Sequence, residues 1–287
     1  MRAIAISPLL RGLLKDGGEL CGVFSGALGI RCGSLAVMLQ SENVAASCAA
    51  AVSGLPAGGA GCRVGARVSL RGDSILLGDA TQIDLAGAEI WGGMTVEPLS
   101  PMTPARLAQA LETVKNCLLR HRREDGFSLL LGGLGWDENE PACPAFYNRA
   151  LRAILLLRRA VASGNPEQAA EAQKNLVGFG AGLTPSGDDF LTGFWAAVLM
   201  LSGNRAAAVS HAINRLADPA ARTTIYGYSE LWALQKGYCG EPVCSAIRAL
   251  AEGVHADEAL GRLASFGGTT GADTVLGIAE ALLTLAV

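Results

Sequence analysis

Residues 178–190 combine the residue types that a site for a small anion requires. They read Gly-Phe-Gly-Ala-Gly-Leu-Thr-Pro-Ser-Gly-Asp-Asp-Phe and continue into an apolar helical run. Glycines let the backbone approach a ligand closely, and Pro185 suits a first helical turn that Thr184 or Ser186 can cap. The free N–H groups at such a helix start attract anions. The segment therefore predicts a helix N-terminus that binds a small negatively charged molecule.

Two carboxylates, Asp188 and Asp189, stand inside this anion-attracting turn. Acids at that place bind a cation, handle a proton or accept hydrogen bonds from the amides of the helix start. Mg²⁺ needs only one or two carboxylates besides water and substrate oxygens, so these two residues are the candidate ligands if a metal is used. No other cofactor is indicated. The residues alone leave the three roles open.

A second segment near the end of the chain repeats this spacing. Residues 186–193 and 270–277 both fit the pattern Ser/Thr-Gly-x-Asp-x-x-x-Gly, and each follows a glycine-rich lead and opens an apolar helix. In each copy the hydroxyl residue precedes the acid by three positions, which is the spacing of a capping box. The acid and the later glycine are four residues apart and share a helix face.

The repeated pattern predicts that two helices cross closely. Glycine on a helix face permits a second helix to approach, so we expect the crossing near Gly193 and Gly277. Such a crossing would bring Asp189 and Asp273 toward one pocket. The alternative is two ordinary N-caps that belong to unrelated helices. The duplicated glycine spacing favours the shared pocket.

The segment at 178–190 resembles the hallmark of the AllH-like family, which is associated with the oxamate carbamoyltransferase of anaerobic allantoin breakdown. Residues 222–224, Arg-Thr-Thr, together with Ser229 resemble a second segment of that family, and residues 267–277 resemble its terminal motif. One position departs from the family pattern. Gly268 stands where a histidine is expected, so a proton transfer by that histidine is absent here or is done differently.

The N-terminal half follows the family pattern as well. The runs at 74–78 and 83–85 lead to Trp91, so the resemblance extends over nearly the whole chain. In the central segment, Arg222 joins two hydroxyls in a sequence that is poor in charge. The resemblance favours substrate binding by Arg222 over a local ion pair with Asp218.

The resemblance implies a subunit of an oxamate carbamoyltransferase that works with partner subunits. Its substrates would be carbamoyl phosphate, oxamate and oxalurate, small anions that backbone amides and an arginine can hold. Asp188, Asp189 and Asp273 are the expected catalytic residues, which would orient or deprotonate the attacking nitrogen. The expected substrate-binding residues come from the three motifs and are Gly180, Gly182, Thr184, Ser186, Gly187, Arg222, Thr223, Thr269, Thr270 and Gly271.

Two further functions stay open. The first is a non-catalytic assembly subunit of the same complex, in which the glycine motifs serve only tight helix packing; the missing histidine at Gly268 favours it. The second is an independent metal-dependent enzyme that acts on a small anionic substrate, which the adjacent Asp188 and Asp189 permit.

Composition limits the remaining function classes. Of the 287 residues, 50% are hydrophobic and 17% charged, and the net charge is −3 without a basic run, so a globular protein with no nucleic-acid surface is expected. The apolar run at 190–203 is too short to span a bilayer, and the first 20 residues lack a signal-peptide core. We expect a cytoplasmic protein with no membrane contact and eight reduced cysteines. The scattered His121, His211 and His255 predict no zinc site.

Periodicity predicts an α+β fold of two domains. Residues 1–100 alternate short apolar runs with glycine, which predicts a small antiparallel β domain, a barrel or a sandwich. We expect a hairpin turn at 71–73 and an Ala-rich loop at 44–56. Residues 101–287 have mainly helical periodicity, interrupted by a strand at 128–131. Helices are expected from 103 to 118 and at 145–163, 166–177, 190–202, 205–217, 219–237, 241–253, 256–265 and 274–286.

Other charged groups are expected to be solvated. Arg149, Arg152 and Arg159 share one helical face, and we favour an ordinary surface over an anion-binding patch. The acidic loop at 136–140 is interpreted in the same way rather than as a cation site. His211 and His255 are expected to face solvent.

Overall fold

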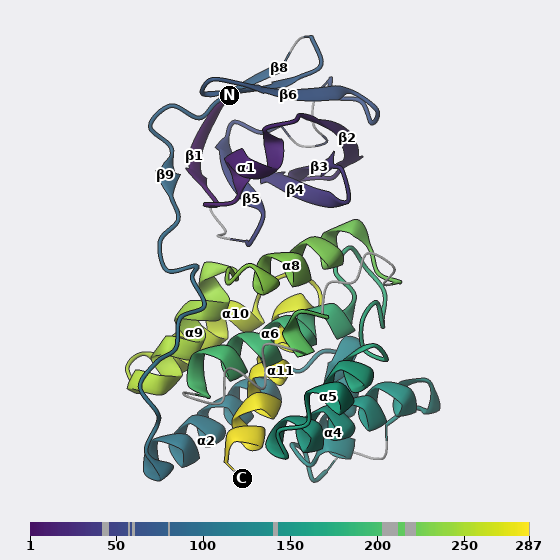
Figure 1. The fold of residues 1–287 in the computed structure, drawn as a ribbon, viewed down its shortest axis with the longest axis vertical. Helices are drawn as coiled ribbons and strands as arrows, with labels where there is room; N and C mark the ends of the chain where they lie inside the picture. The colour runs from purple at the N-terminus through teal and green to yellow at the C-terminus, as the bar shows by residue number, and fades with distance from the viewer. Residues whose placement is uncertain are drawn as a thin grey trace. The chain divides into compact units, whose positions relative to one another are not determined.

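The computed structural model describes residues 1–41, 46–56, 58, 61–79, 81–139, 143–202, 212–215 and 222–286. The chain forms two compact units, Met1–Met94 and Thr95–Val287. Strands make up the first unit and helices the second, as Figure 1 shows, so the α+β class is confirmed. The division lies within the Gly- and Pro-rich stretch between residues 92 and 104.

The first unit is a closed β-sheet with one short helix, α1 (Leu10–Leu14). The sheet has the order β5-β4-β3-β2-β6-β7-β8-β1-β9, and β1 also pairs with β5, which closes eight strands into a barrel. Of the two predicted forms, the barrel is therefore confirmed. Its strands are β1 Arg2–Ile6, β2 Gly18–Val23, β3 Ala27–Cys32, β4 Leu35–Gln40, β5 Ala49–Ser53, β6 Arg67–Arg71, β7 Ser74–Leu77, β8 Thr81–Asp84 and β9 Glu89–Ile90.

Alternating aliphatic side chains fill the barrel. Leu20, Ile30, Val68, Ile75 and Ile83 are fully buried and pack in one cluster. Successive side chains of a strand point to opposite faces, so a strand such as β3 contributes every second residue, Leu28 and Ile30, to this core. The interior is a packed core that makes the unit stable by burying apolar area.

Two local predictions for this unit have different outcomes. The hairpin turn is confirmed, because β6 and β7 pair antiparallel around Gly72, which has a φ of +56°. The loop expected at 44–56 is wrong for residues 49–53, which form β5; residues 44 and 45 lie outside the described part. Alanine has a weak strand preference, but β5 lies between β1 and β4 and is buried, so its neighbours decide its conformation.

The second unit is helical in its described part. Its elements are α2 Pro104–Arg120, η2 Gly126–Leu130, α3 Leu131–Leu134, η3 Ala145–Tyr147, α4 Asn148–Ala162, α5 Pro166–Gln173, α6 Ser186–Leu201, α8 Ile225–Gln235, α9 Glu241–Glu252, α10 Ala256–Ala264 and α11 Thr270–Leu285, where η marks a 3₁₀ helix. The predicted helix starts at Thr103 and Pro166 are confirmed. Thr103 Oγ1 accepts a hydrogen bond from Arg106 N at 3.2 Å, and proline follows the cap in both α2 and α5.

Two predictions in this unit need correction or fall outside the structure. The strand expected at 128–131 is wrong, because these residues lie in η2 and α3 and are mostly buried among the helices. A short apolar run does not distinguish a strand from a buried helical turn. The helix expected at 205–217 lies almost wholly outside the described residues, as does the start of the one at 219–237, which is described as α8.

Two central helices, α6 and α11, cross in backbone contact (Figure 1). Nearly every residue of both helices is buried. A Cβ atom added at Gly193 would overlap the Thr274 carbonyl oxygen, and one at Gly277 would overlap the Phe190 carbonyl oxygen. The predicted crossing at these two glycines is therefore confirmed, and glycine is required there because the two backbones touch.

Alanine at either crossing glycine should destabilise the protein. We expect Gly193→Ala and Gly277→Ala each to lower the free energy of unfolding by about 2–3 kcal/mol, since a backbone oxygen cannot move aside as a flexible side chain can. Urea denaturation followed by circular dichroism measures the change. Gly268→Ala is the matched control, because a Cβ at Gly268 meets no atom within 4 Å. Equal unfolding midpoints for all three variants would contradict the tight crossing.

Candidate functional site

The crossing brings the N-termini of α6 and α11 together. Thr184 Oγ1, just before α6, lies 3.1 Å from Thr270 Oγ1, the first residue of α11. The carboxylates of Asp189 and Asp273 lie close enough for the charge of Asp273 to raise the pKa of Asp189. The two segments with the repeated pattern thus form one cluster, and the predicted approach of Asp189 and Asp273 is confirmed.

In each of the two motifs, the hydroxyl group contacts the acid of the other motif. The Ser186 hydroxyl faces the Asp273 carboxylate, and the Thr270 hydroxyl faces the Asp189 carboxylate, so each acid is served by the opposite helix. The predicted capping roles of Ser186 and Thr270 are wrong. Pro185 and Thr269 occupy the N-cap positions, and neither helix has a side-chain cap. A hydroxyl inside the first helical turn does not have the extended backbone that N-cap geometry requires.

Asp273 is fully buried and only partly paired. Its Oδ1 accepts a hydrogen bond from Phe127 N at 2.7 Å, while Oδ2 has no hydrogen bond of normal geometry although Ser186 and Thr269 face the group. Gly126, with a φ of +65°, covers the carboxylate, and a Cβ there would lie 2.9 Å from both oxygens. Burial raises the pKa of Asp273 to about 7, more than these donors lower it.

Asp189 lies in the same apolar surroundings. Thr184 Oγ1 donates to its Oδ2 at 3.2 Å, and Thr270 faces it from α11. Burial first, and then the negative charge of Asp273, raises the pKa of Asp189 well above its ordinary value. No cation of the described residues faces these two buried acids, which therefore retain protons near neutral pH. A protonated carboxyl group can donate a hydrogen bond.

Asp188 has a different environment from Asp189. Its Oδ1 accepts a hydrogen bond from Gly178 N at 2.8 Å, and its Oδ2 accepts one from the Thr223 hydroxyl. Gly227 packs directly against the same carboxylate, where a Cβ would overlap Oδ2. Burial raises the pKa of Asp188 to about 6. Both oxygens are thus engaged in tying the glycine-rich turn to the segment at 222–224.

The glycines of the motifs fall into two groups. Gly187 and Gly271 are equivalent in the two copies and are buried against backbone; a Cβ would overlap the carbonyl oxygen of Leu176 or Leu263, respectively. Packing against backbone explains the residue type at these two positions. Gly180 and Gly182 are exposed on the turn and have positive φ values of 111° and 103°, so they leave backbone accessible to a ligand.

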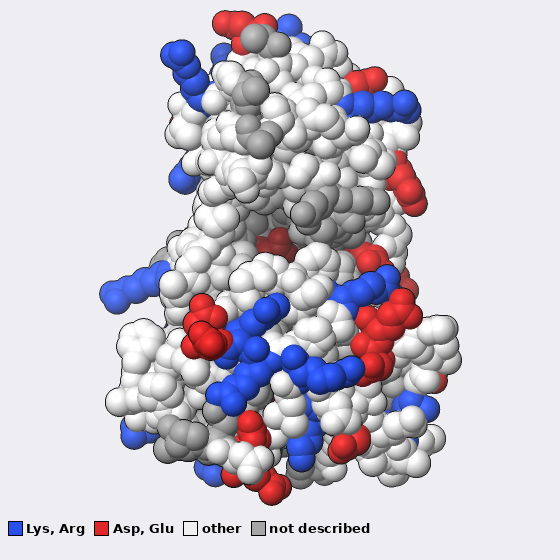
Figure 2. All heavy atoms as spheres, turned by 180° about the vertical axis from the view of Figure 1, so that it is seen from behind, with Lys and Arg blue, Asp and Glu red and all other residues white. Residues whose placement is uncertain are grey.

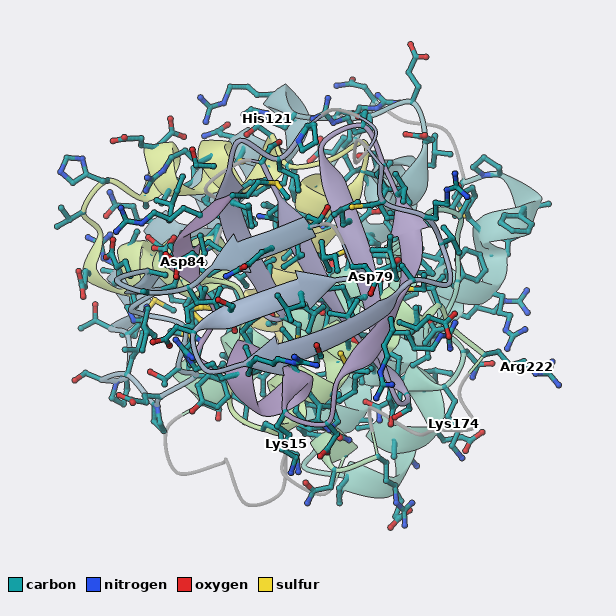
Figure 3. The ribbon with its side chains drawn as sticks, turned by 90° about the horizontal axis from the view of Figure 1, so that it is seen from above. Lys15, Asp79, Asp84, His121, Lys174 and Arg222 are labelled. Carbon is teal, nitrogen blue, oxygen red and sulfur yellow. The ribbon has the colours of Figure 1, made fainter. Side chains whose placement is uncertain are left out.

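The segment at 222–224 does not bring its arginine to the acid pair. Arg222 is exposed, and Figure 3 shows its side chain pointing away from the molecule. Asp218, its predicted local alternative, lies outside the described residues. Thr223 donates to Asp188, while Thr224 caps α8 by accepting from Gly227 N at 2.9 Å. The two hydroxyls are therefore used inside the fold.

Gly268 lies in the loop before α11 and is exposed. A Cβ there meets no atom within 4 Å, so close packing does not require glycine where the family pattern leads one to expect histidine.

Four of the side chains that are expected to be solvated lie on the surface. Arg149, Arg152, Arg159 and His255 are exposed, which confirms the solvated face, whereas His211 and Glu140 lie outside the described residues. Basic and acidic side chains lie next to one another on the face in Figure 2. All eight cysteines have free thiols. Within the described ranges, no helix is long and apolar enough to cross a membrane, and no three potential metal ligands gather.

Sequence reasoning missed several polar and aromatic partners. The backbone amide of Phe127 donates to Asp273. In α4, which carries the exposed arginines, Arg158 pairs with the buried Glu280 at 3.2 Å. Trp136 Nε1 donates to the same glutamate at 2.6 Å. A single glutamate in the otherwise apolar 274–286 run was the only signal in the sequence for this buried pair.

Comparison with known proteins finds one family model that matches part of the chain. The family model for oxamate carbamoyltransferase subunit AllH matches residues 176–282, the range that contains both copies of the pattern and the 222–224 segment. The resemblance to the AllH-like family is thereby confirmed, and this range carries it. No curated protein matches the chain. No solved structure matches it either.

The raised pKa of Asp273 predicts how stability depends on pH. The folded protein holds a proton with a pKa of about 7 that the unfolded chain releases near 3.8. Stability from this group is therefore complete at low pH and is lost as pH rises toward 7, by at most about 4 kcal/mol at 1.4 kcal/mol per pKa unit. Asp273→Asn should flatten the decrease in unfolding free energy between the two pKa values, from about pH 4 to about pH 7, measured by urea denaturation.

Glu138→Gln provides the control for that measurement, because it removes an exposed carboxylate in the same unit. Its pH profile should follow that of the unchanged protein. An Asp273→Asn profile that also runs parallel to the unchanged one would show that Asp273 is ionised in the folded state.

Proposed function

We propose that the paired N-termini of α6 and α11 form the site of carbamoyl transfer between carbamoyl phosphate and oxamate. The protein would act in the phosphorolysis of oxalurate during anaerobic allantoin and purine catabolism, in the cytoplasm, where its thiols stay reduced. The observation that carries the proposal is the buried Asp189–Asp273 pair, framed by four hydroxyl residues and located within the matched range 176–282. A subunit family implies further subunits, so we propose a hetero-oligomer.

Protonation makes the acid pair compatible with an anionic substrate. Two ionised carboxylates would repel carbamoyl phosphate, whereas the raised pKa values of Asp189 and Asp273 keep protons in the pair near neutral pH. A protonated acid donates to an anionic oxygen, and the helix N-termini add their own positive potential. Binding should therefore weaken as pH rises above about 7.

The chemistry needs a proton at one nitrogen. In the phosphorolysis of oxalurate, a phosphate oxygen bonds to the carbamoyl carbon and the bond from that carbon to the oxamate nitrogen breaks. The leaving nitrogen then takes up a proton, which the pair can supply, and the reverse reaction returns it. Asp273 Oδ2, which has no hydrogen bond of normal geometry, is the candidate atom for this transfer. Hydroxyls and backbone amides would stabilise charge on the carbamoyl oxygen.

The donor set does not fit the magnesium ion considered for Asp188 and Asp189. Both oxygens of Asp188 are engaged with Gly178 and Thr223, and Gly227 packs against them. A metal there would have to replace these contacts, so we derive no step through a metal. We propose instead that Asp188 is a positioning residue that holds the glycine-rich turn. An independent metal-dependent enzyme loses Asp188 as a candidate ligand by the same argument.

The second candidate is a non-catalytic assembly subunit. Helix packing alone explains Gly187, Gly193, Gly271 and Gly277, since a Cβ at each would overlap a backbone oxygen. The missing histidine at Gly268 also favours this function. Packing does not explain the unpaired Oδ2 of Asp273, and this atom is the reason that we prefer a substrate site.

Removing either acid should abolish turnover. In the complex assembled with its partner subunits, Asp189→Asn and Asp273→Asn should each lower the rate of oxalurate phosphorolysis at least about 100-fold, because each removes a proton donor at the reacting nitrogen. Circular dichroism should show an intact fold. Glu138→Gln is the control and should keep the full rate. Normal turnover by either Asn variant would exclude that residue from catalysis.

Arg222 offers a separate test of the binding residues. Since its side chain is exposed and points away, Arg222→Ala should change the affinity of the complex for phosphate less than about twofold, measured by calorimetry. A loss of about tenfold or more would mean that Arg222 contacts the anion after all, as the sequence alone suggests.

A further inference from the structure

Tyr147 lies beside the proposed site and has no part in the mechanism derived above. It ends η3, and its side chain is half-buried. The Tyr147 ring lies 5.8 Å from that of Phe179 in the glycine-rich turn, and 5.3 Å from the exposed ring of Phe146. Tyr147 therefore packs on the turn that carries the motif at 178–190.

A second set of contacts connects Tyr147 with the acid pair. Phe179 also packs against Phe127 at 5.8 Å, and the Phe127 amide donates to Asp273. The phenol oxygen faces the backbone N–H of Gly126, the residue that covers the Asp273 carboxylate. Tyr147 thus borders the acid pair on the side of the Gly126–Phe127 turn.

The hydroxyl proton of Tyr147 is free to donate. Among the described residues, the one hydrogen-bonding group that faces this phenol is the Gly126 N–H, which is itself a donor. Burial, followed by the charges of Asp273 and Asp125, raises the pKa of Tyr147, so the hydroxyl remains protonated at neutral pH. A half-buried, protonated phenol at the Gly126–Phe127 turn, whose Phe127 amide binds Asp273, is suited to an anionic oxygen.

We propose that Tyr147 is a substrate-contacting residue of this site, whose hydroxyl donates a hydrogen bond to a carboxylate or phosphate oxygen of the bound anion. The inference rests on the proposed function for the location of the anion. It adds a donor from outside the three sequence motifs and assigns the Gly126–Phe127 turn and η3 to the binding site. The charge of the anion is then met by neutral donors: a phenol, hydroxyls, amides and protonated acids.

Calorimetry on the assembled complex tests the contact with two probes, oxamate and inorganic phosphate. Tyr147→Phe removes only the hydroxyl and should weaken the affinity for one of the two about tenfold or more, and the probe that loses affinity identifies the oxygen that is bound. Phe146→Leu is the control, because this neighbouring ring is 70% exposed and has no hydroxyl, and it should bind as the unchanged complex does. Unchanged affinity of Tyr147→Phe for both probes would overturn the proposal.

A second readout does not depend on binding or turnover. In protein labelled with ¹³C-tyrosine, the pKa of Tyr147 followed by NMR should fall in Asp273→Asn if the phenol faces that carboxylate. An identical titration in both proteins would remove Tyr147 from the acid pair. The two proposals can fail separately. If the unchanged complex binds a probe but does not turn over oxalurate, carbamoyl transfer alone is rejected. If the unchanged complex turns over oxalurate and the Tyr147→Phe variant binds both probes normally, the tyrosine contact alone is rejected. A complex that binds neither probe rejects both.

Discussion

The structure of the helical unit depends on the backbone contact between α6 and α11 at Gly193 and Gly277. Two helices approach this closely only where neither has a side chain in the way. The contact fixes the two N-termini side by side, and with them two carboxylates that water would otherwise solvate. Tight packing and buried acid therefore have one cause: the same crossing that excludes water from the core also raises the pKa of Asp189 and Asp273.

Burying the carboxyl groups of Asp189 and Asp273 costs free energy of desolvation. Desolvation of a carboxylate is unfavourable, and the group escapes part of it by remaining protonated. Elsewhere in the same unit, the buried Glu280 is compensated by Arg158 and Trp136, so the fold can pair an acid when only stability is at stake. Among the residues that the structure describes, hydroxyls and an amide face Asp189 and Asp273, and no cation does. This difference is what separates a candidate site from a structural ion pair.

Local spacing predicted the crossing well and its details poorly. An aspartate and a glycine four residues apart share a helix face in any context, so Gly193 and Gly277 could be identified from the sequence. The exchange of Ser186 and Thr270 between helices could not, because it depends on which residues lie across the contact. Buried segments misled for a related reason: Ala49–Ala51 became a strand and Ser128–Leu131 a helical turn under the influence of their neighbours. Phe127 reaches Asp273 only through tertiary packing.

The repeated pattern is nearly, but not fully, symmetric. Hydroxyl, glycine and acid recur in both copies, yet Ala272 stands where the first copy has Asp188. If the two copies were identical, a linear ligand bound between them could adopt either of two opposite orientations with equal affinity. Because only the first copy has an additional carboxylate, Asp188, the two ends of the proposed binding site differ chemically. A ligand whose two ends differ would consequently bind in one orientation.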